Sequence, residues 1–118
     1  MIPDGYKSTV LKLAEKTKTA SLEWSTTSNS SEFLVKFSKF SVAIFQGFDQ
    51  NEGDEFVRFD IYDFEGKEID TFFVSESEKE WTTVSQLYGN ARRKALKIDE
   101  AISSINKELD DLVDDVPF

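Results

Sequence analysis

Neither cysteine nor histidine occurs in this chain, and each absence removes a class of chemistry. Without cysteine there can be no disulfide, no thiolate nucleophile, no iron-sulfur cluster and no zinc site with cysteine ligands. Without histidine the chain lacks the side chain that most often transfers protons near neutral pH and that commonly ligates metals. Catalysis within one chain would depend on carboxylates, lysine, arginine or tyrosine, or on a metal held by oxygen ligands.

Glycine-rich loops and long apolar runs are also lacking. The five glycines stand apart from one another, and none forms a phosphate-binding loop before a helix. No apolar run approaches the length of about 20 residues that a membrane span requires, and the first residues do not resemble a signal peptide. We therefore expect a cytoplasmic protein that binds no cofactor and no membrane.

What the chain does contain is core-forming and acidic material. Its 118 residues include 39% hydrophobic residues and eleven Phe, which is enough for one core, so we expect a single domain over 1–118. The 23 acidic residues outnumber the 14 basic ones and give a net charge of -9. This charge opposes attraction to phosphate backbones, so we expect no direct nucleic-acid binding, and it suits either a basic partner or plain solubility.

The periodicity of apolar residues predicts an α+β fold in the order α-β-β-β-β-α-α. A helix is expected within 1–19, capped by Asp4, and the polar run 25–31 is expected to be a mobile loop. Period-two alternation predicts a four-stranded antiparallel meander within 32–75. The expected strands are 32–38, 41–48, 55–63 and 67–74. Helical spacing returns within 77–110, with a break near Lys97 before a helix capped by Asp99, and an acidic tail follows over 111–118.

The strand register can be predicted from the last hairpin, where Gly66 suits a three-residue turn. If Asp63 pairs with Lys67, then Val57 faces Phe73. Together with Phe59, Ile61, Ile69, Val35 and Ile44, these residues should form one buried face.

The same register places Asp60 opposite Asp70 on the second face of the sheet. Facing carboxylates can bind a divalent metal or share a proton, which would suit a carboxylate- or metal-dependent enzyme. Like charges opposite one another also cost stability, and the alternative interpretation is a solvated edge relieved by Arg58 and Lys36.

Apolar and aromatic side chains also project from this second face, namely Leu34, Phe45, Tyr62 and Phe72. A fully solvated face would carry fewer of them. Two accounts stay open: a helix or the segment 22–24 covers this face, or the face is open and binds a partner.

The only dense basic cluster is Arg92, Arg93 and Lys94. It predicts either a site for a small anion or phosphate, or neutralisation of nearby acidic residues. The cluster lies in the stretch Leu87 to Ala101, in which Tyr88 and Ala-Arg-Arg-Lys-Ala-Leu are followed by Asp-Glu-Ala, and Asp60-Ile61-Tyr62-Asp63 and Gly66 come earlier in the chain. This stretch resembles a group of short uncharacterised bacterial proteins, and the resemblance implies the order of the elements but no function.

Taken together, these features favour a noncatalytic protein-binding domain, such as an inhibitor, immunity factor or adaptor for a basic partner. Its candidate binding residues are the apolar set above and the acidic residues Asp110, Asp111, Asp114 and Asp115. A second hypothesis is an acidic mimic of nucleic acid that blocks a DNA- or RNA-handling enzyme. The third is the enzyme that would use Asp60 and Asp70.

Overall fold

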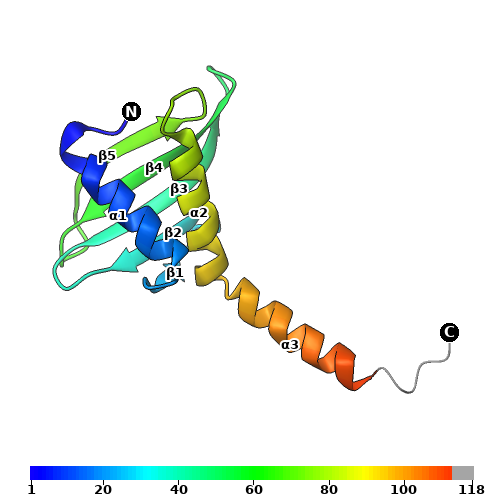
Figure 1. Ribbon diagram of the computed structural model, residues 1–118. Coiled ribbons are helices and arrows are strands. Elements are labelled where there is room, and N and C mark those ends of the chain that lie inside the picture. The colour runs from blue at the N-terminus through cyan, green and yellow to red at the C-terminus, as the bar shows by residue number, and fades with distance from the viewer. Residues whose placement is uncertain (113–118) are drawn as a thin grey trace.

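The computed structural model describes residues 1–112, in which two helices cover one face of an antiparallel sheet and a third helix extends away from it (Figure 1). The elements in chain order are a 3-10 turn η1 (Asp4–Tyr6), α1 (Lys7–Lys18), β1 (Trp24–Thr26), β2 (Glu32–Lys36), β3 (Ser41–Asp49), β4 (Asp54–Tyr62), β5 (Glu68–Ser75), α2 (Trp81–Ala95) and α3 (Ile98–Asp111). The fold is α+β, as the sequence predicts, and the strand order is β1-β2-β3-β4-β5.

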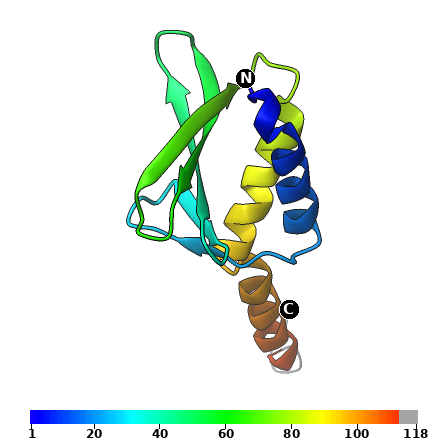
Figure 2. The same cartoon turned by 90° about the vertical axis from the view of Figure 1, so that its left-hand side faces the viewer.

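Both helices of the main body pack on the same side of the sheet, as the side view in Figure 2 shows. In α1 the buried side chains are Val10, Leu13 and Thr17, which lie three and four residues apart on one helical face. In α2 the buried series runs from Val84 to Ala91 with the same spacing. The apolar stripes of the two helices therefore form one layer over the sheet. The first helix begins at Lys7 and not beside Asp4, which lies in the preceding 3-10 turn.

The pairing of β2, β3 and β4 follows the predicted meander. Val42 lies opposite Ile61, and Ile44 lies opposite Phe59. Phe33, Val35, Val57, Phe59 and Ile44 are buried against the helices. The alternation of apolar residues thus places these three strands with the correct face toward the core.

The pairing of β4 with β5 differs from the prediction because a bulge interrupts it. Tyr62 lies opposite Glu68, but Ile61 lies opposite Asp70, so Ile69 is the extra residue. One extra residue moves every later side chain of the strand to the other face. Phe72, and Val74 two residues on, therefore face the helices and are buried, whereas Ile69 and Phe73 are exposed.

The prediction that Ile69 and Phe73 are buried is therefore wrong. Phe72, placed on the second face by the sequence, belongs to the core: its ring stacks on Phe59 at 4.8 Å and on Tyr6 at 4.9 Å between centroids. These two contacts favour the shifted register, because it buries Phe72 between a strand and the chain segment that leads into α1.

The number of strands is also corrected, from four to five. Trp24 to Thr26, expected to be a short segment and the start of a mobile loop, pairs with β2 at the edge of the sheet. Trp24 is buried, and its Nε1 donates a hydrogen bond of 3.0 Å to Oγ1 of Thr17 in α1. This bond satisfies the indole N–H inside the core and attaches β1 to the helix layer.

The predicted break before the last helix is present. Lys97 adopts a left-handed conformation with φ of 57°, and α3 begins at Ile98 with Asp99 in its first turn. The left-handed residue turns the chain, so α3 leaves the body and does not continue α2 (Figure 1). Among residues 1–112, none of the helices is long and apolar enough to cross a membrane.

Candidate functional site on the open face of the sheet

One face of the sheet carries no helix in the part of the chain that the structure describes, and we call it the open face (Figure 2). Among residues 1–112 neither of the two expected covers lies over this face, since α1 and α2 share the other side of the sheet and the segment near Trp24 joins its edge. The strand register places side chains from β2 to β5 on the open face, among them Glu32, Leu34, Ala43, Phe45, Phe56, Arg58, Asp60, Tyr62, Thr71 and Phe73.

Three phenylalanines form an aromatic cluster on this face. The ring of Phe56 lies 6.2 Å from that of Phe45 and 6.1 Å from that of Phe73, edge-on to the latter. The guanidinium carbon of Arg58 lies 4.7 Å from the centroid of Phe45, which is a cation-π geometry. The rings of Phe45 and Phe56 lie against Gly47, where an added Cβ would be 2.8 Å from ring carbons of both. Glycine at this position lets the two rings lie across the strand.

Beside this cluster the surface is hollowed and acidic. The hollow is lined by aromatic and basic side chains from the strands and by carboxylates from the β3–β4 hairpin, namely Phe56, Phe73, Arg58, Asp49, Glu52 and Asp54, with Ser75 and Ser77 completing it. An apolar wall next to several carboxylates suits the side chain of a lysine or arginine, since the stem packs on aromatic rings while the charge meets the acids.

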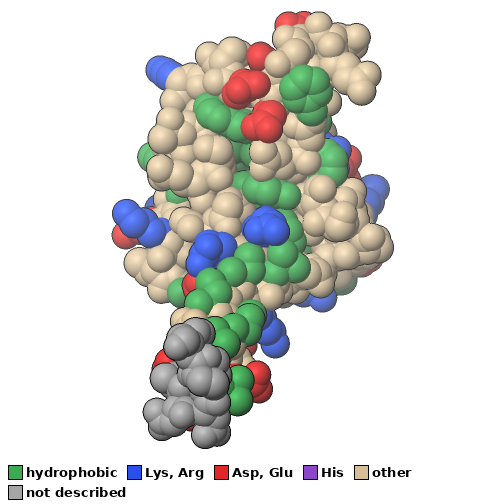
Figure 3. All heavy atoms as spheres, turned by 90° about the vertical axis from the view of Figure 1, so that its right-hand side faces the viewer, with side chains coloured by type: hydrophobic (Ala, Val, Ile, Leu, Met, Phe, Trp, Pro, Cys, Tyr) green, Lys and Arg blue, Asp and Glu red, His purple; other side chains and the backbone are tan. Residues whose placement is uncertain are grey.

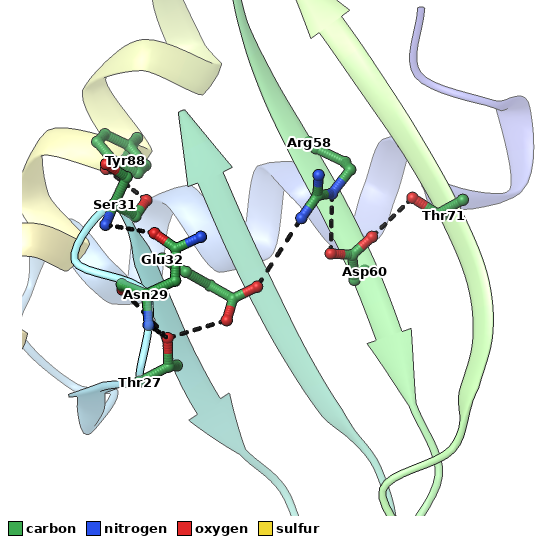
Figure 4. A network of polar contacts seen from close by, with 8 residues as sticks. All are labelled: Thr27, Asn29, Ser31, Glu32, Arg58, Asp60, Thr71 and Tyr88. Atoms are coloured by element: carbon green, nitrogen blue, oxygen red, sulfur yellow. Dashed lines mark hydrogen bonds and ion pairs between the residues drawn. The ribbon is translucent and has the colours of Figure 1, made fainter. Parts of the chain in front are cut away.

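At the centre of the open face, Asp60 anchors a polar network (Figure 4). Its side chain is buried, and it accepts hydrogen bonds from Nε of Arg58 at 3.0 Å and from Oγ1 of Thr71 at 2.7 Å. A terminal nitrogen of the same arginine lies 3.9 Å from a carboxylate oxygen of Glu32. Arg58 is thus held between two acids and over a ring, which fixes the centre of the face.

The network continues into the segment between β1 and β2. Thr27 donates to Glu32 at 2.9 Å, and it accepts a hydrogen bond from the backbone N–H of Asn29. The side chain of Asn29 in turn accepts from the N–H of Ser31, whose carbonyl accepts a 2.7 Å bond from the hydroxyl of Tyr88. Burial raises the pKa of Tyr88, which keeps this donor protonated. This chain of bonds ties the expected mobile loop to α2.

The predicted pair of facing carboxylates does not form. Because of the bulge, Asp60 lies opposite Thr71, while Asp70 lies opposite Ile61 and so belongs to the other face. Asp70 accepts a 2.7 Å bond from the hydroxyl of Tyr6, and this bond raises the pKa of the phenol. Within residues 1–112, no three carboxylates gather as they would to hold a metal ion.

Leu34 lies opposite Ala43, next to Phe45, and Tyr62 lies opposite Ser41 at the end of β4. Leu34 and Tyr62 line a second hollow together with the turn residues Phe37 and Phe40. Burial raises the pKa of Tyr62, and the charge of Asp60 raises it further, so the phenol stays neutral at physiological pH. Of the four apolar residues predicted for this face, the structure thus places Leu34, Phe45 and Tyr62 there.

The basic cluster lies in the last turn of α2, away from the open face. Arg93 forms an ion pair with Asp99, and Nζ of Lys94 lies 3.4 Å from a carboxylate oxygen of Glu23. Two of the three predicted anion-binding residues therefore have acidic neighbours, and Arg92 lines a shallow polar hollow with Arg93.

The acidic candidates Asp110 and Asp111 are exposed at the end of α3. Asp114 and Asp115 lie outside the described residues.

Sequence reasoning missed two residues of the aromatic cluster. Phe56 has the same parity as Arg58 and Asp60 in β4, so the alternation of the strand was a sufficient signal for its face. Phe73 gave no such signal, because the bulge reverses its face.

Comparisons of the chain with protein-family models, curated proteins and solved structures found no match. The resemblance of the Leu87 to Ala101 stretch stays a prediction.

Proposed function

We propose that this chain is a noncatalytic protein-binding domain, such as an inhibitor, immunity factor or adaptor, and that its open face receives a basic partner. The observation that carries the proposal is an aromatic cluster on an uncovered sheet face, bordered by carboxylates. Phe73 is 58% exposed although its ring packs edge-on against Phe56. An exposed aromatic held in a fixed position is the kind of side chain that dominates binding energy in protein interfaces.

Charge supports the basic nature of this partner. The chain carries a net charge of -9, and the hairpin beside Phe73 presents Asp49, Glu52 and Asp54 to the hollow. Complementary charge raises the association rate at low salt, whereas a buried aromatic anchor mainly slows dissociation. The two contributions can therefore be measured separately.

The test compares two Phe→Ala variants from the same region. Immobilised wild type, Phe73→Ala and Phe48→Ala are used to capture proteins from a lysate of the host, with and without nuclease and over a salt series. Phe48 is the matched control, because its side chain is 59% exposed and lies one residue beyond Gly47, on the opposite face of β3. We expect a partner that is retained by the wild type and by Phe48→Ala but lost by Phe73→Ala.

Binding kinetics with the captured partner then test the division of roles. Phe73→Ala should speed dissociation by more than about tenfold. Replacing Glu52 and Asp54 by Gln and Asn should slow association and flatten its salt dependence. The proposal fails if Phe73→Ala and Phe48→Ala bind equally well, if nuclease abolishes all capture, or if the purified protein converts a substrate.

A further inference from the structure

The projecting helix α3 carries an apolar stripe that nothing covers in the described chain. Ile98, Ile102, Ile105, Leu109 and Leu112 are separated by steps of four, three, four and three residues. This is the spacing of the seam positions in a two-stranded coiled coil. The last four of these side chains are between 47% and 59% exposed, and among residues 1–112 no residue of α3 is buried. Figure 3 shows hydrophobic side chains following the helix away from the body.

An isolated helix of this length is not expected to be stable by itself. The 14 residues of α3 span about 21 Å, and helices shorter than about 12 to 15 residues are marginal in water even with favourable sequences. One face of α3 carries three isoleucines and one leucine. Burial of these side chains would remove apolar surface from water without desolvating a polar side chain. Packing against another helix is the usual source of stability for such an element.

The charged residues of α3 do not oppose burial of this stripe. If Ile102 and Leu109 take position a of the heptad, then Glu100, Lys107, Asp110 and Asp111 occupy the outer positions b, c and f. The positions that flank the seam hold only two charges, Asp99 and Glu108. The acidic charge of the helix therefore lies mostly on its solvent side.

The two ends of the helical region have opposite charge. Residues 92–100 hold four basic side chains, Arg92, Arg93, Lys94 and Lys97, against the two acidic ones Asp99 and Glu100, whereas residues 107–111 hold Lys107 against Glu108, Asp110 and Asp111. A parallel pair of such helices would place basic beside basic and acidic beside acidic. An antiparallel pair places each basic end beside the acidic end of the other helix.

We propose that α3 pairs in antiparallel fashion with α3 of a second copy of this chain. In this pairing Ile102 packs against Ile105 of the second copy, and Ile98 packs against Leu109 of the second copy, since a and d positions share layers in antiparallel coils. The contact is isologous, so it closes as a two-fold dimer with the bodies at opposite ends and both open faces left available.

The first test is self-association measured by sedimentation velocity over roughly a hundredfold range of concentration at low salt. Short helix pairs form small interfaces, so we expect a dimer with a dissociation constant on the order of micromolar that weakens as salt rises. Ile105→Asp should raise that constant by more than about tenfold. Ser104→Asp is the control, because it adds the same side chain to the outer surface of the same helix.

The second test determines the orientation of the helices by disulfide cross-linking. Because the chain contains no cysteine, each introduced cysteine is the only thiol in its variant. Ile98→Cys and Leu109→Cys are prepared as separate variants and oxidised alone and as a mixture. The antiparallel pairing predicts a disulfide-linked dimer only in the mixture, because the two positions meet only across the seam. A parallel pairing would link each variant to itself.

The proposal is overturned if the wild type stays monomeric over the whole concentration range, if Ser104→Asp weakens the dimer as much as Ile105→Asp, or if each cysteine variant links to itself alone. Tryptophan fluorescence of each variant confirms that the body is folded, since Trp24 and Trp81 lie outside α3. Because Phe73 lies on another element, failure here leaves the capture experiment on the open face unaffected, and the two proposals fail separately.

Discussion

The register of β5 makes opposite predictions for two adjacent phenylalanines, and this offers a direct test of the fold. Phe72 is buried between the rings of Phe59 and Tyr6, whereas the neighbouring Phe73 is exposed on the open face. A regular hairpin without the bulge would exchange the two roles. The variants Phe72→Ala and Phe73→Ala therefore measure which side of the sheet each ring occupies.

The expected magnitudes follow from burial. Truncating a buried phenylalanine typically costs about 3 to 5 kcal/mol, and Phe72 would also lose two ring stacks. Phe73 keeps one aromatic contact and is mostly in water, so Phe73→Ala should cost about 1 kcal/mol or less. In urea denaturation followed by tryptophan fluorescence, Phe72→Ala should lower the midpoint by at least about 1 M, and Phe73→Ala by less than half of that.

A control guards against a variant that does not fold. Phe72→Leu retains much of the side-chain volume and should fold with an intermediate loss of stability. The assigned register is refuted if Phe73→Ala is the more damaging of the two alanine variants, or if both cost the same. Either result would mean that Ile69 is not the extra residue of β5.

Two further predictions concern buried polar groups. Arg58→Ala should destabilise the fold by about 1 to 3 kcal/mol, because it removes a donor from the buried side chain of Asp60 while Arg58 itself is 38% exposed. Adding Asp60→Asn to it should restore part of the loss in the same urea assay, and an absence of any restoration would contradict this reasoning. The pKa values of Tyr6, Tyr62 and Tyr88 are raised, by a hydrogen bond to a carboxylate for Tyr6 and mainly by burial for the other two. The folded state then holds these protons more tightly than the unfolded state, so the contribution of the three tyrosines to stability should be constant below about pH 10 and should be lost as the pH rises above it. A rise in the melting temperature above about pH 10 would contradict the assignment.

Much of the fold was readable from local patterns. The alternation of Val42 and Ile44 in β3 and of Val57 and Phe59 in β4 predicted which face of these two strands is apolar, because strand side chains alternate strictly. The break at Lys97 was readable because a second apolar series begins after it. The strand boundaries agree with the structure to within about two residues, since turn residues separate the apolar runs.

Long-range packing decided the rest. Trp24 to Thr26 is too short to show a period, and it forms a strand only because it pairs with β2 and because Thr17 satisfies the indole of Trp24. The bulge at Ile69 cannot be read from β5 itself, since Ile69, Phe72 and Phe73 offer apolar residues to either face. A one-residue shift in the register of β5 becomes favourable only because it lets Phe72 stack between Phe59 and Tyr6.

The candidate site shows the same division. The sequence alone determined that the second face carries Leu34, Phe45 and Tyr62, that the chain is strongly acidic, and that it lacks cysteine and histidine. Only the tertiary structure separated Asp60 from Asp70, joined Phe73 to Phe56 and left the face uncovered. The physical reason is that residue type and period specify which side chains prefer burial, whereas the partners that bury them come from segments far apart in the chain.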